Sequence, residues 1–145
     1  MFNAIAIDPG MSKCGLVIVD IKQKKVCEAK VIRSNHLIDY VKKIYQKDQN
    51  IELLIGNGTT SQKYIKELSK FSPKLIIVEE KNSTYRAKQR YFEIFPLKGF
   101  QHFLPRDIFI LNKNLDALAA LVIIEDYYNL KFVNTESIST KTWLR

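Results

Sequence analysis

The order of the apolar segments is the feature that most constrains the fold of this chain. Three strand-like segments follow one another closely at the start, and strand-like and helical segments alternate from there on. Closely spaced strands are typical of antiparallel hairpins, whereas the later alternation is typical of parallel strands joined by helices. The sequence therefore predicts an α/β fold whose mixed sheet combines three antiparallel strands with parallel crossover units.

Turn residues and changes of hydrophobic period give the bounds of the expected elements. The predicted strands are residues 3–8, 14–20, 25–33, 52–56 and 74–80, and residues 105–111 form a further strand or an extended loop. The predicted helices are residues 34–45, 61–71, 83–95 and 115–128. Beyond Asn129 the chain is polar and weakly patterned, so we expect a tail or a short edge element there. No repeat or linker interrupts the sequence, and residues 1–145 are interpreted as one domain.

Four of the five glycines fall in two loops of the predicted sheet. Gly10 and Gly15 follow the first strand, and Gly56 and Gly58 follow the fourth. Glycine permits a positive φ and a close approach to the backbone. Both loops should leave the same edge of the sheet, where open parallel sheets bind ligands. Ordinary tight turns are the alternative interpretation of each loop.

Carboxylates are expected to converge on that same edge. Asp8 ends the first strand, Glu79 and Glu80 end the fifth, and Asp116 begins the last helix. Oxygen ligands of this kind suit Mg²⁺ or Mn²⁺. Strand alternation allows only one of the two glutamates to face the site. A hydrogen bond to the turn remains an alternative for Asp8, and a favourable first-turn helix acid remains one for Asp116.

Asp20 is excluded from this group by its position in the first hairpin. If the first two strands turn about Met11, Asp20 lies opposite Phe2, which is roughly 20 Å from Asp8 along the strand. We therefore expect Asp20 to be structural or exposed to solvent.

The net charge points to a polyanionic partner. The chain has 23 Lys and Arg against 15 Asp and Glu, a formal charge of +8, which is typical of proteins that bind nucleic acid. A genome that favours lysine codons is the alternative explanation.

The sequence has no apolar run long enough for a membrane span and no secretory leader, and Cys14 and Cys27 are isolated, so a cytoplasmic protein without a membrane partner is expected.

Three segments together resemble the YqgF (RuvX) family of Holliday-junction-resolvase-like and ribosomal-RNA-processing nucleases, within the RNase H-like superfamily. AIAIDPGMSKCGLVIVD is similar to the opening strand, D-x-G loop and second strand of that family. IVEEKNSTYRAKQRYFE is similar to the strand that ends in Asp-Glu-Arg and leads into a helix, which selects Glu80 over Glu79. LDALAALVIIEDYY is similar to the final helix. The resemblance covers nearly the whole chain.

This resemblance implies a five-stranded sheet of order 3-2-1-4-5 flanked by helices, and metal-dependent cleavage of branched DNA or of precursor 16S rRNA. It assigns Asp8, Glu80 and Asp116 to the acidic triad, which would hold two Mg²⁺ or Mn²⁺ ions that activate water and stabilise the leaving oxygen. The small residues after Asp116 would let the last helix approach the sheet closely. Two symmetric cuts in a junction would need two subunits, so a homodimer is an expected assembly for that substrate.

Basic residues and loop backbone near the acids are the expected substrate contacts. Lys13 and Lys81 lie in the two site loops, and Arg86 and Arg90 are one helical turn apart. The residues expected to bind the substrate are Lys13, Lys81, Arg86, Arg90, Gly10, Gly56, Gly58 and Thr84. A solvated helix face is the alternative for the two arginines. Tyr85, Tyr91 and Phe92 can stack on bases or form part of the core.

Departures from the family pattern favour a second hypothesis. Met11 stands where the family has a small hydroxyl residue, and Ala119 stands where some resolvases have a further acid. The loop IGNGTTSQ resembles that of the YqgF-like domain of transcription accessory proteins, which is thought to lack the nuclease acids. A catalytically silent nucleic-acid-binding module is therefore the second hypothesis. The Asp-Pro-Gly loop also resembles that of actin-like sugar kinases, but those need two lobes to enclose ATP.

Overall fold

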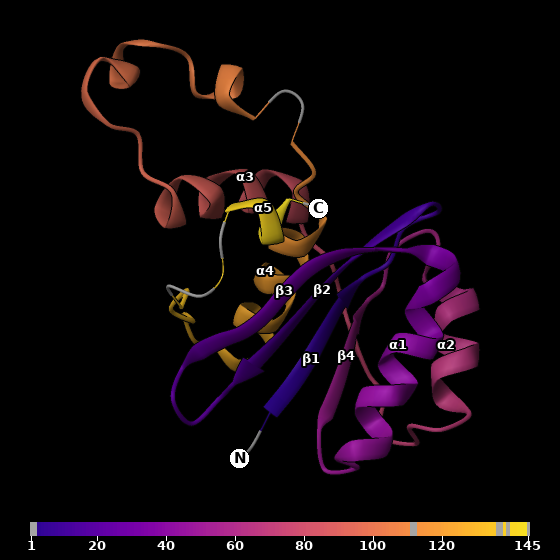
Figure 1. Cartoon of the computed structure of the whole chain (residues 1–145). Coiled ribbons are helices and arrows are strands. Elements are labelled where there is room, and N and C mark those ends of the chain that lie inside the picture. The colour runs from indigo at the N-terminus through magenta and orange to yellow at the C-terminus, as the bar shows by residue number, and fades with distance from the viewer. Residues whose placement is uncertain (1–2, 111–112, 136–137, 139, 145) are drawn as a thin grey trace.

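A computed structural model describes residues 3–110, 113–135, 138 and 140–144 of the chain (Figure 1). Its centre is a five-stranded sheet of order β3-β2-β1-β4-β5. The strands are β1 (Asn3–Asp8), β2 (Lys13–Asp20), β3 (Lys25–Arg33), β4 (Glu52–Gly56) and β5 (Ile76–Val78). The α-helices are α1 (Ser34–Lys47), α2 (Ser61–Ser69), α3 (Ser83–Ile94), α4 (Asp116–Tyr128) and α5 (Thr140–Trp143), and the 3-10 helices are η1 (Gly99–Phe103) and η2 (Arg106–Phe109).

The pairing of the strands confirms the predicted mixed sheet. β1 pairs antiparallel with β2, and β2 pairs antiparallel with β3. β1 and β4 are parallel, as are β4 and β5. This order and these directions are the RNase H-like arrangement that the sequence resemblance implies.

Alternating residues of the sheet face two apolar layers. On one face Ile5 and Ile7 of β1 pack with α1 and α2. On the other face Ala4 and Ala6 of β1 pack against α4, together with α3 and the C-terminal segment. Large side chains on the first face fill the space under two amphipathic helices, whereas small side chains on the second face let α4 lie close to the sheet.

α4 approaches the sheet closely at Gly15 of β2. A Cβ atom at this position would be 1.8 Å from the backbone oxygen of Asp116 and 2.7 Å from the nitrogen of Ala117. Ala117 and Ala120 are fully buried in the same interface. The short side chains therefore bring the first turn of α4 directly onto β2, as the sequence predicted for the small residues after Asp116.

Several element bounds differ from the prediction. Residues 105–111 were expected to form a strand or extended loop, but Arg106–Phe109 is the 3-10 helix η2, and Leu111 lies outside the described residues. The apolar run therefore does not join the sheet. β5 spans three residues instead of seven, so Glu79 and Glu80 follow the strand.

The C-terminal segment contains more structure than its polarity indicated. Val133 forms a parallel bridge with Lys25, which confirms the short edge element, and the segment continues into the unpredicted helix α5. Phe132 and Trp143 are buried, and the indole nitrogen of Trp143 donates to Oδ1 of Asn134 over 3.1 Å. Two large aromatic side chains thus anchor a segment that has no periodic pattern.

Asp20 is structural, as its position in the hairpin predicted. It pairs with Asn3 at the opposite end of β1 from Asp8, and its buried carboxylate accepts a hydrogen bond of 2.9 Å from the backbone nitrogen of Gln23. Among the described helices none is long and apolar enough to cross a membrane.

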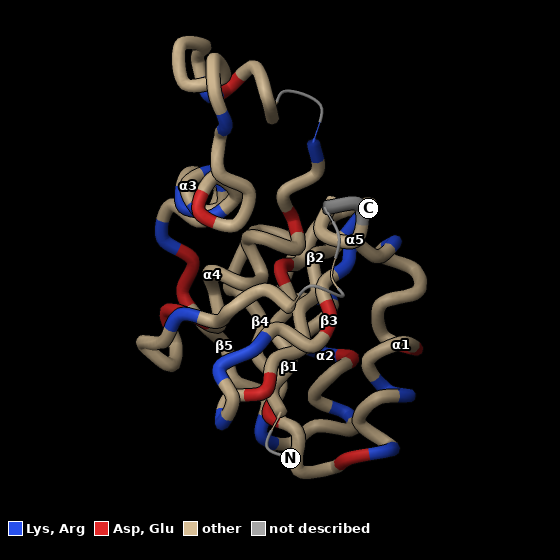
Figure 2. The backbone as a smooth tube through the Cα atoms, turned by 60° about the vertical axis from the view of Figure 1, so that its left-hand side comes forward, with Lys and Arg blue, Asp and Glu red and all other residues tan. Residues whose placement is uncertain are grey.

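Residues 95–110 form an arm between α3 and α4. The arm contains η1 and η2, and its two ends pack on the core through Phe95 and Ile110. In two views of the molecule the middle of the arm stands away from the sheet, beyond α3 (Figures 1 and 2).

Candidate active site

Glycines at the end of β4 form a floor beneath the carboxylate of Glu80. A Cβ atom at Gly56 would lie 1.8 Å from Oε1 of Glu80, and one at Gly58 would lie 3.2 Å from Oε2. Neither glycine has a positive φ among the described backbone angles, so conformational freedom does not explain them. Both glycines instead give Glu80 the room to reach across β4.

Asp8 and Asp116 lie beside each other at the same edge of the sheet. Asp8 is the last residue of β1 and pairs with Gly15 of β2. The backbone of Asp116 lies directly on Gly15, so the first residue of α4 is held beside the end of β1. Gly15 therefore contributes to the site although the sequence analysis did not assign it there. The only signal that could have found it was its place in the glycine-rich loop.

The ionisation of Asp8 depends on both of the other acids. Burial, reinforced by the charges of Glu80 and Asp116, raises the pKa of Asp8 to about 8. Burial also raises the pKa of Glu80. It raises the pKa of Asp116 as well, against the lowering effects of the Asn114 side chain and the Lys13 charge. All three groups therefore resist ionisation unless a positive charge compensates them.

The donor set fits a hard divalent cation. Oε1 of Glu80 is buried and has no hydrogen-bond partner, and the carboxyl groups of Asp8 and Glu80 are within hydrogen-bonding reach of each other. Oxygen atoms in this setting are what Mg²⁺ and Mn²⁺ bind. Within the described part of the chain, no group of three His, Cys, Asp or Glu side chains is arranged as a complete metal site. Asp8 and Glu80 are thus the pair that could hold a cation, with Asp116 next to them.

Glu79 has surroundings that differ from those of Glu80. It is exposed, and its Oε1 accepts a hydrogen bond of 2.7 Å from Nδ2 of Asn57. Of the two glutamates the structure brings Glu80 to Asp8, which is the one that the resemblance selected, but both residues follow β5, so strand alternation is not the reason.

The loop after Asp8 is held by groups that the sequence analysis did not single out. The hydroxyl of Tyr64 donates to the backbone oxygen of Gly10 over 2.5 Å, and Oγ1 of Thr60 donates to that of Pro9 over 3.3 Å. Burial and the neighbouring Cys14 raise the pKa of Tyr64 to about 12, so its hydroxyl remains a donor. Tyr64 looks like an ordinary core residue of α2 in the sequence, and no pattern marks it as a contact of this loop.

Three of the expected substrate contacts lie beside the acids. Lys13 is exposed and close enough to Asp116 for its charge to lower the pKa of that carboxyl. Lys81 directly follows Glu80 and is exposed. Thr84 lines a hollow of about 660 Å³ next to Asp116. Two lysines that were not expected there, Lys88 and Lys113, also line this hollow. Its lining residues are Thr84, Lys88, Asp107, Ile110, Lys113, Asn114, Leu115 and Asp116.

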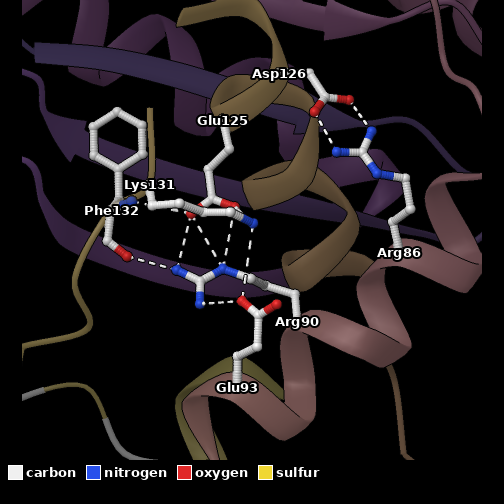
Figure 3. A network of polar contacts seen from close by, with 7 residues as sticks. All are labelled: Arg86, Arg90, Glu93, Glu125, Asp126, Lys131 and Phe132. Carbon is white, nitrogen blue, oxygen red and sulfur yellow. Dashed lines mark hydrogen bonds and ion pairs between the residues drawn. The ribbon is translucent and has the colours of Figure 1, made fainter. Parts of the chain in front are cut away.

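The two arginines of α3 point toward the C-terminal end of α4 (Figure 3). Arg90 is only 9% exposed, and its guanidinium donates to Glu125 over 2.9 Å and to the backbone oxygen of Phe132 over 2.7 Å. Arg86 forms a two-pronged ion pair with Asp126. The expected phosphate contact of Arg90 is therefore corrected to a structural role, because its charge is buried and already paired. Arg86 is partly exposed, but its charge is engaged in the same way.

The aromatic residues of α3 were expected either to stack on bases or to form part of the core, and they differ in exposure. Tyr91 and Phe92 are buried in the core, with their rings edge to face at 5.1 Å between centroids. Tyr85 is 63% exposed. Only Tyr85 of this group is accessible to a ligand.

No model of a protein family matches the chain, and no curated protein matches it. Among solved structures, the chain is similar to RuvC of Thermus thermophilus in complex with a Holliday junction substrate, with 13% identity, 89% of this chain and 96% of that chain covered, and a TM-score of 0.48. It is also similar to the large terminase nuclease of the thermophilic phage G20c, with 8% identity, coverage of 99% and 70%, and a TM-score of 0.45. A third likeness is to the Ppx/GppA phosphatase of Aquifex aeolicus, with 10% identity, coverage of 66% and 42%, and a TM-score of 0.39. At these identities the similarity concerns the fold alone.

Proposed function

We propose that this protein is a metal-dependent nuclease that hydrolyses phosphodiester bonds in structured nucleic acid, either branched DNA or precursor 16S rRNA. The observation that carries the proposal is the carboxylate of Glu80, which lies over the Gly56 floor beside Asp8 with a buried oxygen that nothing donates to. Bringing acids together in a half-buried site costs folding free energy. Such a cost is typical of a site kept for a ligand.

The acids have distinct tasks in this proposal. Asp8 and Glu80 would hold a Mg²⁺ or Mn²⁺ ion between them, and Asp116 would complete its surroundings from the start of α4. When bound, the ion supplies positive charge to the phosphate oxygens and lowers the pKa of water. Lys13, whose charge acts on Asp116, would meet a phosphate group and offset the repulsion between it and the acids.

The loop contacts explain how the acids keep their positions. Tyr64 and Thr60 tie the backbone after Asp8 to α2. Gly15 lets the start of α4 lie directly against β2, and Gly56 leaves room for the carboxylate of Glu80. The carboxylates are therefore preorganised by backbone packing before any substrate arrives, which is what an efficient site needs.

Cleavage assays on acid variants test the proposal. A four-way DNA junction and a precursor rRNA fragment are incubated with Mg²⁺ or Mn²⁺ and with wild type, Asp8→Asn, Glu80→Gln or Asp116→Asn. We expect each variant to lose about 100-fold or more in rate, because metal-assisted stabilisation of charge contributes several kcal/mol. Glu79→Gln is the matched control, since it removes an equal charge from the adjacent, exposed position.

Binding of Mn²⁺ gives a readout that does not depend on finding the right substrate. Titration followed by electron paramagnetic resonance should show tighter binding to wild type and to Glu79→Gln than to Glu80→Gln. If the wild type cuts neither substrate and Glu80→Gln binds Mn²⁺ as well as wild type does, the nuclease proposal is wrong.

A catalytically silent nucleic-acid-binding module is the second candidate. It is favoured by the absence of a complete three-ligand metal site within the described residues and by the IGNGTTSQ loop. Such a module would bind nucleic acid equally well with Glu80 or Gln at position 80. Metal-dependent cleavage that Glu80→Gln abolishes would exclude it.

A further inference from the structure

The arm (residues 95–110) exposes an unusual amount of apolar surface. Phe103 is 89% exposed, Phe100 is 75% exposed, and Ile108 and Leu104 are also exposed. These side chains lie within nine consecutive residues, while the two ends of the arm pack on the core. Exposed aromatic side chains that are grouped on a protruding segment mark a surface that another molecule covers.

The charges around this surface indicate a polyanion. Lys98 and Arg106 belong to the arm, whose described residues contain only one acid, Asp107. Two further lysines, Lys88 and Lys113, line the hollow between the arm and Asp116. Basic side chains interleaved with exposed aromatic rings are typical of surfaces that bind single-stranded nucleic acid.

The lysines of the hollow are weakly engaged within the protein. Nζ of Lys88 is 3.9 Å from Asp107, at the outer limit of an ion pair. Nζ of Lys113 is 5.9 Å from the centre of the Tyr91 ring. By contrast, Arg90 on the same helix as Lys88 is held by direct ion pairs. Lys88 and Lys113 can therefore turn to phosphates without breaking a strong contact.

We propose that the arm and the hollow bind an unpaired strand of nucleic acid that leads away from the three acids. The phosphates of the strand contact Lys88 and Lys113, and its bases stack on Phe100 and Phe103. The strand is unpaired because duplex bases already stack on one another and do not present their faces to side chains. The position of the strand relative to a cleaved bond rests on the proposed function, whereas the binding itself does not.

A second copy of the chain fits this surface less well. Two arms in contact would bring Lys98 and Arg106 of one copy toward the same residues of the other, and each chain carries a charge of +8. A nucleic acid strand instead supplies the negative charge that these residues lack. The charge of the arm thus favours a polyanion over self-association.

Binding without metal tests the stacking half of the proposal. Fluorescence anisotropy in EDTA measures the affinity for a labelled single strand of about 20 nucleotides, as DNA and as RNA, and for a blunt duplex of the same sequence. We expect Phe100→Ser with Phe103→Ser to weaken single-strand binding by about tenfold or more and duplex binding by less than about twofold. Val133→Ser, which changes an exposed apolar residue outside the arm, is the control and should change neither.

The salt dependence of binding tests the phosphate half. Lys88→Gln with Lys113→Gln should reduce the slope of log affinity against log salt by about 1.4 for a single strand, since each phosphate contact contributes about 0.7. Lys43→Gln with Lys66→Gln removes the same charge from exposed positions on α1 and α2, which cover the other face of the sheet, and should leave the slope unchanged.

Two outcomes would overturn the proposal. In the first, the variant that carries Phe100→Ser and Phe103→Ser binds a single strand as tightly as wild type does. The other is concentration-dependent dimerisation in sedimentation experiments that the same variant abolishes with no loss of strand binding, which would make the arm a contact between copies. Because the binding assay contains no metal, a wild type that cuts neither substrate, together with unchanged Mn²⁺ affinity in Glu80→Gln, would refute the nuclease and leave the result for the arm intact.

Discussion

The substitution Gly56→Ala separates the function of the site from the stability of the fold. The added Cβ would stand 1.8 Å from Oε1 of Glu80, 2.6 Å from Cδ and 2.8 Å from Cγ. Ordinary van der Waals contact begins at 3.4 Å, so the carboxylate oxygen must retreat by about 1.6 Å, the difference between 3.4 and 1.8 Å. The far end of a flexible side chain can move this far, whereas the backbone of β4 is fixed between two parallel strands.

The expected changes in rate and in stability have different sizes. A displacement of about 1 Å at a reacting centre costs on the order of 100-fold in rate. The free energy of unfolding should stay within about 1 kcal/mol of wild type, because alanine is favoured over glycine in a strand by about 0.5–1 kcal/mol. In addition, the displaced Glu80 regains contact with water. The variant should therefore be folded, close to wild type in stability and deficient in metal binding and cleavage.

The assay compares Gly56→Ala with Gly58→Ala. A Cβ at Gly58 would be 3.2 Å from Oε2, which requires a shift of only a few tenths of an ångström and should cost much less activity. Mn²⁺ affinity, cleavage rate and thermal unfolding are measured for both variants. If Gly56→Ala binds Mn²⁺ and cleaves within about twofold of wild type, the position of Glu80 over the glycine floor is not what the site needs, and the reasoning fails.

Three further predictions concern folding and pH. Gly15→Ala places a methyl group 1.8 Å from the backbone at the start of α4, which no side-chain movement relieves, so urea unfolding should show a loss of about 1–3 kcal/mol or more. Because the pKa of Asp8 is raised to about 8 in the folded protein, the metal-free protein should lose stability as the pH rises from about 4 through 8, and Asp8→Asn should flatten this dependence in thermal unfolding. Arg90→Met removes the guanidinium from the buried carboxylate of Glu125, which keeps only Lys131 at 3.4 Å and the backbone N–H of Phe132, and should cost about 3–5 kcal/mol of unfolding free energy. Arg86→Ala, which breaks a half-exposed pair, should cost about 1 kcal/mol or less.

The sequence predicted the sheet because its signals are local. Each strand is a short apolar run that ends in a turn, so the pattern places residues 3–8 and 52–56 correctly without knowledge of their partners. The same reasoning did not place residues 105–111, since an apolar run shows that side chains need cover but not what covers them. In the structure Arg106–Phe109 forms the 3-10 helix η2 within the arm, and Ile110 at the end of the arm packs on the core.

The arginines show why side-chain roles are harder to predict than elements. Helical spacing correctly placed Arg86 and Arg90 one turn apart on one helix. It could not show that Glu125, 35 residues away in the sequence, lies opposite Arg90 and takes its charge. Tyr64 was missed for the same reason, because its contact with Gly10 joins residues 54 positions apart. Such roles depend on pairs that only the folded chain brings together.

The order of the strands explains why a glycine at the end of β4 matters so much for the acids. β4 lies between β1 and β5, so a carboxylate that follows β5 must cross β4 to reach Asp8. Any side chain at position 56 would occupy the space through which Glu80 passes. The sheet order therefore makes Gly56 part of the arrangement that joins Glu80 to Asp8. A module that only bound nucleic acid would gain nothing from this contact, because a half-buried pair of carboxylates would repel phosphate, whereas a cation held between the two acids would make the same position attractive to phosphate.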